Sequence, residues 1–201
     1  MDKKSDEDKH YNWMMGADMY LATAVILCDK MLESYISPIE ALNSVQQIDK
    51  KCGFTSANPD YEMLMPVVFN LKHGAELYIK ALIMQTHPKL EYPTSHDLLA
   101  LLDVLIKNLR TNGLEDNIVN ALDQDARAII EKYYYGLYAF STVKTTPDIN
   151  NEAERYSEYR NANCYQIKEL FNVVNVDLVE SIKKDCVILQ RIFREEIYRK
   201  I

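Results

Sequence analysis

The chain is poor in residues that interrupt helices. Its 201 residues include only five glycines and six prolines. No stretch sustains the alternation of apolar and polar residues that a half-buried strand needs. The composition therefore excludes a fold of many short strands joined by glycine- and proline-rich turns, and it predicts long helices.

Basic residues are also in deficit. Lysine and arginine number 23 against 30 acidic residues, which gives a net charge of −7. A protein that binds nucleic acid along a broad surface needs a basic face to displace counterions from phosphates. The balance argues against such a surface, although a small basic cleft stays compatible with it.

Motifs for metals and cofactors are missing. The four cysteines lack a Cys-x-x-Cys spacing, no two histidines have the spacing of metal ligands, and glycine is too scarce for a phosphate-binding loop. We therefore expect neither a metal nor a cofactor. Cys28 and Cys186 fall on apolar helix faces, which indicates buried thiols in a reducing compartment.

The beginning of the sequence, "MDKKSDEDKH", has no apolar core of the kind that signal peptides carry, and no apolar run is long enough to span a bilayer. We expect a cytoplasmic protein without a membrane segment. Apolar residues make up 48% of the chain, enough for a globular core. The sequence predicts a disordered tail over 1–12 and a single helical domain over 13–201.

Apolar residues recur at steps of three and four over 17–35, 64–84, 98–109, 118–133 and 167–197, and each repeat predicts an amphipathic helix. The 64–84 repeat is apolar on nearly every side, so it should be central in an up-and-down helical bundle. Pro66 either begins this helix or kinks it. The last repeat predicts a helix of about 50 Å unless Asn175 divides it.

Residues that favour helix ends mark further boundaries. The sequence "SPIE" at 37–40 is typical of a helix start, and that helix should end at Gly53. Ser95 is expected to cap the helix over 96–110, and Gly113 to end it.

One polar stripe interrupts the apolar surface of the central helix. His73, Glu76 and Lys80 lie within about 60° of each other, since positions three, four and seven apart share a helix face. Apolar neighbours flank them, so we expect partial burial and a second helix that supplies polar groups to the stripe. The three are candidate ligand-binding residues, although buried polar groups of this kind more often form packing networks.

Two other places are candidates for binding. His96 follows the expected cap at Ser95, where a neutral imidazole can exchange a proton or can simply bond to the backbone. Arg155, Tyr156 and Arg160 combine guanidinium groups, which bind phosphate, with a ring that stacks on bases. Such clusters also occur in ordinary helix–loop packing.

The segments "FNLKHGAELYIKALI" and "PTSHDLLALLDVLI" together resemble the HEPN superfamily of helical domains. The resemblance extends over 61–109, and His73, Glu76 and Lys80 match polar positions of the family's central helix. It implies a helical bundle that is often a homodimer. Many members are metal-independent ribonucleases of toxin–antitoxin, defence or RNA-processing systems, whereas others bind nucleotides, RNA or proteins without catalysis.

Active members carry an arginine, four to six residues, and then a histidine. The nearest match in this chain is Arg127, with Lys132 where the histidine is expected. A protonated lysine is a poor general base. We therefore expect no catalytic residues, and a non-catalytic module that binds a nucleotide, RNA or a protein partner. A divergent ribonuclease and a helical enzyme of another reaction are the alternatives. We also expect a homodimer through the C-terminal helix, whose apolar stripe reaches Ile197.

Overall fold

The computed structural model describes residues 4–36, 59–87, 93–134 and 175–201, and all elements in these ranges are helices. They are α1 (Lys4–Ile36), α3 (Pro59–Thr86), α4 (Leu98–Thr111), α5 (Asp116–Ala121), α6 (Arg127–Tyr133) and α8 (Val176–Gln190). A π-helical turn, Leu122–Ala126, joins α5 to α6. A π-helical segment, Arg191–Ile197, and a 3-10 turn, Tyr198–Lys200, extend α8 to the C-terminus. The prediction of an all-α fold is confirmed.

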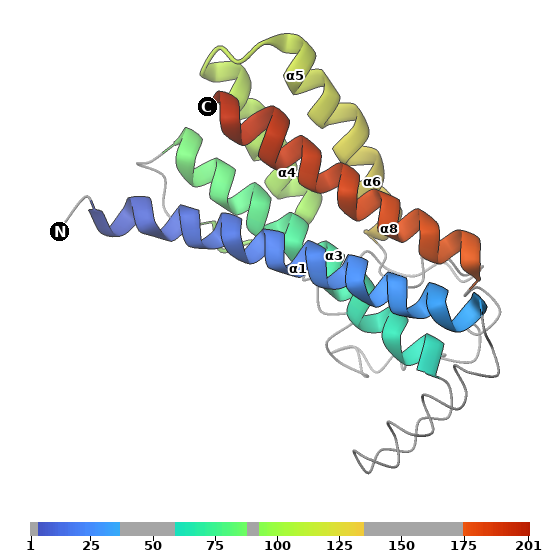
Figure 1. Cartoon of the computed structure of the whole chain (residues 1–201). Helices are drawn as coiled ribbons and strands as arrows, with labels where there is room; N and C mark the ends of the chain where they lie inside the picture. Colours follow the sequence, from blue (N-terminus) through green and yellow to red (C-terminus); the bar gives the residue numbers. More distant parts are fainter. Residues whose placement is uncertain (1–3, 37–58, 88–92, 135–174) are drawn as a thin grey trace, which may run out of the picture.

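Helix α3 has neighbours on several sides. It runs antiparallel to α1, and it also contacts α4, α6 and α8 (Figure 1). Helix α8 lies along α1 in the opposite direction (Figure 1). A helix that is apolar on nearly every side needs such surroundings, since each apolar side must be removed from water.

Small residues let α1 and α3 approach closely. Ala17 and Ala75 are fully buried at this contact, and Gly74 faces Leu21. A Cβ atom added to Gly74 would lie 2.9 Å from Cγ of Leu21 and 3.3 Å from the carbonyl oxygen of Ala17. Glycine is therefore required at position 74 by the packing and not by the backbone conformation.

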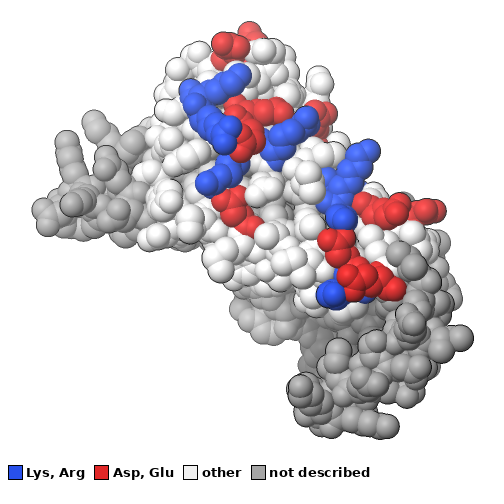
Figure 2. Space-filling model, in the orientation of Figure 1, with Lys and Arg blue, Asp and Glu red and all other residues white. Residues whose placement is uncertain are grey.

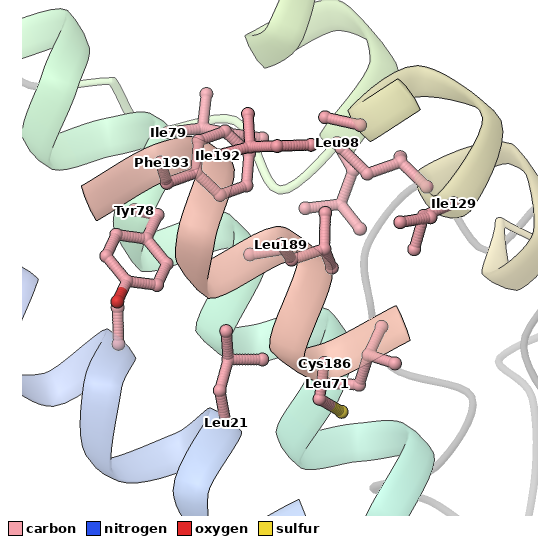
Figure 3. Packing of buried hydrophobic residues seen from close by; sticks show 14 of the residues in the cluster. Leu21, Leu71, Tyr78, Ile79, Leu98, Ile129, Cys186, Leu189, Ile192 and Phe193 are labelled. Carbon is pink, nitrogen blue, oxygen red and sulfur yellow. The ribbon is translucent and has the colours of Figure 1, made fainter. Parts of the chain in front are cut away.

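The predicted apolar faces meet in one core, in which side chains of α1, α3, α4, α6 and the C-terminal helix converge (Figure 3). The fully buried residues of these faces include Leu21, Cys28, Leu71, Tyr78, Leu82, Leu102, Leu109, Leu122, Tyr133, Cys186, Leu189 and Phe193. Cys28 and Cys186 are free thiols, as predicted. The positions that the helical repeats select are thus the positions that fill the core.

Several helix ends differ from expectation or resolve an alternative. Pro66 lies inside α3, which begins at Pro59, and the side-chain amide of Asn70 donates to the carbonyl of Pro66 at 2.6 Å. The cap of α4 is Asp97 and not Ser95. The Asp97 carboxylate accepts the backbone N–H groups of Leu99 and Ala100, each at 3.1 Å. A carboxylate suits this place because it also interacts with the positive end of the helix dipole.

The other end of α4 follows the prediction. Gly113 has a φ of 74°, in the left-handed region that favours glycine. Its N–H donates to the carbonyl of Arg110 at 3.1 Å, and the N–H of Leu114 donates to the carbonyl of Leu109 at 3.1 Å. This pair of bonds is a Schellman motif, and Leu114 completes it by packing on the core.

The first helix begins earlier than predicted, and the last described α-helix begins directly after Asn175. Helix α1 begins at Lys4, so most of the expected disordered tail over 1–12 is helical. Asn175 caps α8 by accepting the N–H of Leu178 at 2.8 Å, so the C-terminal helix starts there.

The end of the apolar stripe on which a dimer was expected lies inside the chain. Ile197 is fully buried within the chain, and Tyr198 packs partly against the core. Charged side chains follow this helix on the outside, whereas much of the surface along α1 is uncharged (Figure 2). Within the described residues, no helix combines the length and apolarity needed to cross a bilayer.

Candidate functional site

Four of the predicted site residues meet around one buried carboxylate. Glu76, near the middle of α3, is 2% exposed. Its Oε1 accepts a hydrogen bond from Nζ of Lys80 at 2.8 Å and lies 2.9 Å from Nδ1 of His96. Nδ1 of His73 lies 3.8 Å from the other oxygen, Oε2. The expected partial burial is confirmed, as is the arrival of a polar group from another segment.

The local fold explains why these groups converge. The spacing of His73, Glu76 and Lys80 places them on one side of α3. His96 comes from the extended residues that lead into α4, next to the cap at Asp97. The hydroxyl of Tyr134, which follows α6, donates to both oxygens of Asp97 at 3.1 Å. The start of α4 is therefore fixed from two directions.

His96 lies before the helix cap rather than after it. The Asp97 N–H donates to Oγ of Ser95 at 3.1 Å, which closes a turn around His96. The imidazole bonds to the side chain of Glu76, so the interpretation of His96 as a backbone-bonded capping residue is wrong. The side chain of His96 is 46% exposed, in contrast to the buried carboxylate beneath it.

Aromatic rings hold His73 on the opposite side of the stripe. Phe69, one turn earlier, stacks on the imidazole with ring centres 5.4 Å apart. Tyr20 of α1 approaches it edge-on at 4.5 Å. These contacts fix the ring plane of His73 and tie the stripe to α1. Phe69 has the helical spacing for this contact, but no signal in the sequence pointed to Tyr20.

The arrangement has a defined hydrogen-bonding chemistry. An ionised carboxylate only accepts hydrogen bonds, so the Glu76 contact assigns a proton to Nδ1 of His96. In the neutral ring, Nε2 is then an acceptor, and in the charged ring it is a second donor. The buried ion pair of Glu76 and Lys80 holds the exposed imidazole of His96 in place. The cluster can thus accept a proton or hold an anion at His96.

A second polar cluster lies between α6 and α8. Nζ of Lys132 donates to Oγ of Ser181 at 2.7 Å and to Oδ2 of Asp185 at 2.6 Å. The hydroxyl of Tyr133 donates to the same carboxylate oxygen at 2.6 Å. Burial, together with the charge of Asp185, raises the pKa of Tyr133 far above its ordinary value. These bonds join the two helices.

Arg127 has different partners from Lys132. Its Nε donates to Asp123 at 2.7 Å, and one terminal nitrogen donates to Asp103 of α4 at 2.6 Å. Burial opposes its charge, but these two hydrogen bonds raise the pKa of Arg127 overall. The two residues nearest to the ribonuclease motif are therefore both engaged in ion pairs between helices.

A third cluster joins α1, α3 and the C-terminal helix. Asp18 accepts hydrogen bonds from the hydroxyl of Tyr78, from the guanidinium of Arg194 and from the amide of Gln190, the last at 3.1 Å. Burial, followed by the Asp18 contact, raises the pKa of Tyr78 well above its ordinary value. No local pattern in the sequence indicated this cluster, because its members are far apart along the chain.

Arg155, Tyr156 and Arg160 lie outside the described residues, as does the expected helix over 37–53. Within the part of the chain that is described, no three His, Cys, Asp or Glu side chains are grouped as metal ligands. Comparison with family models, curated proteins and solved structures gave no match to the chain.

Proposed function

We propose that the chain is a HEPN-like helical module that binds a nucleotide or RNA through phosphate and does not cut RNA, in a defence or toxin–antitoxin setting. The resemblance over 61–109 supports this proposal, because it covers most of α3 and most of α4. Helix α3 carries His73, Glu76 and Lys80, and the segment that leads into α4, also within 61–109, carries His96.

The observation that carries the proposal is the position of His96. Its imidazole is nearly half exposed while its Nδ1 is held by a carboxylate that is 2% exposed. A charged ring in this position presents Nε2–H to a phosphate, and a neutral ring presents an acceptor to a ribose hydroxyl. Because Glu76 orients the ring in advance, a ligand would bind without the cost of ordering it.

Arg155, Arg160 and Tyr156 have the residue types that complete such a site. The two guanidinium groups would hold phosphate oxygens in bidentate contacts, and the tyrosine ring would stack on a base. The acidic net charge of −7 fits a small site of this kind better than a long nucleic-acid track.

The absence of cleavage is proposed for a chemical reason. Active members of the family that the chain resembles carry an arginine, four to six residues, and then a histidine. Here Lys132 takes the place of the histidine and is bonded to Asp185, while Arg127 is bonded to Asp103 and Asp123. Both side chains are thus held by carboxylates, and the lysine lacks the imidazole with which the family's active members accept a proton.

Binding can be tested by titrating the full chain with a fluorescent adenine nucleotide and with a short single-stranded RNA. His96→Ala should weaken binding by about tenfold or more, the equivalent of one charge-assisted hydrogen bond of about 1.5–3 kcal/mol. His87→Ala is the matched control, because His87 is an exposed histidine at the other end of the α3–α4 connection. The double change Arg155→Ala, Arg160→Ala should abolish binding with little change in melting temperature.

Three outcomes would count against the proposal. If the wild type shows no binding of the nucleotide or the RNA at concentrations up to about 1 mM, at which even a weak site would be occupied, a protein partner becomes the better hypothesis. Equal effects of His96→Ala and His87→Ala would remove the cluster from the site. Unfolding of the arginine double variant would make those arginines structural.

One observation favours the alternative, a divergent metal-independent ribonuclease. Glu76 and His96 form a carboxylate–imidazole pair, and such pairs orient general bases in hydrolytic enzymes. Incubation of purified protein with RNA in the presence of a chelator tests it directly. Cleavage that His96→Ala stops, and that His87→Ala leaves intact, would replace the binding module with the nuclease.

A further inference from the structure

The imidazole of His96 is held in one neutral form. Its Nδ1 lies 2.9 Å from Oε1 of Glu76, a carboxylate oxygen that only accepts hydrogen bonds. The proton of the neutral ring is therefore on Nδ1, and Nε2 carries a lone pair. No residue that the structure describes forms a hydrogen bond with Nε2, and the side chain is 46% exposed. Nε2 is thus the ring nitrogen at which a ligand can bind.

The surroundings of Glu76 oppose the other neutral form. An exposed histidine ordinarily exchanges between two tautomers and can donate from either nitrogen. Moving the His96 proton to Nε2 would place the lone pair of Nδ1 against Oε1 of Glu76. The carboxylate cannot turn away into water, because it is 2% exposed and Nζ of Lys80 holds the same oxygen at 2.8 Å. His96 therefore donates from Nε2 only after its ring has gained a second proton.

We infer that phosphate binds at His96 together with a proton from solvent, so that a lower pH strengthens binding and a higher pH weakens it. A phosphodiester oxygen accepts hydrogen bonds and donates none, so it needs the Nε2–H of a charged ring. Bound phosphate in turn favours the charged ring, as linkage requires. This inference rests on the proposed function and adds the regulation of that site by pH.

Other charged and titratable groups surround the ring. From α3, Lys80 shares the buried carboxylate oxygen with His96, and Nδ1 of His73 lies 3.8 Å from the other oxygen of that carboxylate. Asp97, next in sequence, caps α4 and accepts the hydroxyl of Tyr134, which follows α6. Lysine, aspartate and tyrosine side chains ordinarily keep their charge state between about pH 5 and 8, whereas imidazole changes its own. A dependence of binding on pH in this interval therefore points to an imidazole.

Anisotropy titrations of the full chain from about pH 5.5 to about 8 test the inference, since imidazole changes charge in this interval. The probe is a short uridine-only RNA with hydroxyl ends and a label of constant charge, so that the ligand does not titrate. The wild-type dissociation constant should rise by about tenfold or more, because the uptake of one proton changes it by up to about tenfold per pH unit. Calorimetry in two buffers of different ionisation enthalpy should show the uptake of about one proton per bound RNA at about pH 7.5.

Replacement of each of the four histidines by glutamine locates the proton. His96→Gln should bind more weakly, with dissociation constants that agree within about twofold over the whole interval, because an amide does not titrate. His87→Gln is the matched control, because His87 is exposed and lies outside the cluster, and it should keep the wild-type slope. His10→Gln should keep that slope too, as should His73→Gln whatever its affinity, because the ligand bonds to His96.

The double change Glu76→Gln, Lys80→Met tests the fixed tautomer. The new amide at position 76 can donate to Nδ1 as well as accept from it, so a neutral His96 can then carry its proton on Nε2. The dissociation constant of the double variant should therefore change by less than about threefold over the same interval. If the pair only supported the fold, the double variant would bind more weakly at every pH and would keep the wild-type slope.

Four results would overturn the inference. A wild type that binds equally well at every pH would mean that a neutral His96 accepts from a ribose hydroxyl, and it leaves the proposed function intact. A wild type that binds at no pH overturns the proposed function as well. A slope that survives in His96→Gln, or that His73→Gln removes, assigns the proton to another group. A double variant with the wild-type slope would show that Glu76 does not fix the tautomer.

Discussion

Oε1 of Glu76 lies 2.9 Å from Nδ1 of His96, a residue that stands 20 positions later in the sequence. The same oxygen accepts the ammonium of Lys80 at 2.8 Å. One carboxylate oxygen thus joins α3 to the segment that begins α4, and it does so with only 2% of the residue exposed. Because a buried charge is costly without a partner, the stability of this carboxylate depends on the groups around it.

We predict strong coupling between Glu76 and Lys80. Lys80→Met leaves a buried carboxylate without its cation and should cost about 3–5 kcal/mol in the free energy of unfolding. The double change Glu76→Gln, Lys80→Met removes both charges, so it should be more stable than Lys80→Met alone. Denaturant titration of the four members of this double-mutant cycle measures the coupling energy.

The same cycle can contradict the prediction. Two small single effects that add within about 0.5 kcal/mol would place the pair in solvent. His96 keeps a hydrogen-bond acceptor in the Glu76→Gln variant, so a large loss in that single variant would have to come from the charge itself.

Gly74 and Leu21 set the distance between α1 and α3. A methyl group at position 74 would lie 2.9 Å from Cγ of Leu21, which is itself buried. Gly74→Ala should therefore destabilise the protein by about 1–3 kcal/mol, the usual cost of overpacking, despite the better helix propensity of alanine. Adding Leu21→Ala should recover part of this loss, because the smaller side chain makes room.

Gly16 provides the comparison, since it lies in α1 at the same interface. A methyl group there would be 3.4 Å from Cδ1 of Leu77, an ordinary contact. Gly16→Ala should be neutral or stabilise the helix by up to about 1 kcal/mol. Thermal or chemical unfolding that ranks the two variants in the opposite order would contradict the packing argument.

Helical periodicity made the buried faces predictable, because apolar residues recur on the side of each helix that is buried in the core. It predicted the buried residues of α4, such as Leu102 and Leu109, and it predicted that the Glu76 stripe would receive a group from elsewhere. The partner itself was harder to foresee. His96 was noticed for its place beside a helix start, but its distance to Glu76 follows from how α4 packs on α3.

Contacts between distant segments left no local trace in the sequence. Asp18 and Arg194 stand 176 positions apart, and each is ordinary on its own helix. Periodicity did separate the methionines of α1, because the repeat over 17–35 includes Met31, which is buried, and leaves out Met19, which is 67% exposed. The homodimer was predicted at the C-terminal helix because its stripe, which reaches Ile197, was expected to extend beyond the core, but Ile197 is buried within the chain.

Two residues of α4 give a direct test of its predicted face. Leu102 is fully buried and Val104 is 41% exposed. Leu102→Ala should cost about 2–5 kcal/mol, whereas Val104→Ala should stay within about 0.5 kcal/mol of the wild type. Urea titration of both variants checks the difference, and a loss below about 0.5 kcal/mol for Leu102→Ala would mean that this face is not in the core.

Alkaline pH should weaken the fold through buried thiol and phenol groups. Burial, together with the nearby charge of Asp29, raises the pKa of Cys28 from 9.0 to about 12. A folded pKa above the unfolded value means that the folded state holds the proton more tightly. The contribution is complete below pH 9 and is lost as the pH rises toward 12. Over that interval the free energy of unfolding should fall by up to about 1.4 kcal/mol per pH unit from this group alone.

Cys28→Ala removes that thiol, so the free energy of unfolding should fall less steeply with pH, by up to about 1.4 kcal/mol per pH unit. Tyr133 and Cys186 continue to contribute, because burial raises their pKa values too. Urea titrations of the two proteins at a series of pH values from about 8 to about 11 measure the slopes. The native wild type should also resist alkylation at Cys28 and react once unfolded, because the thiolate is the reactive form and burial disfavours it. Equal slopes for the two proteins, or rapid alkylation of the native thiol, would show that Cys28 is open to water and that α1 and α8 do not enclose it.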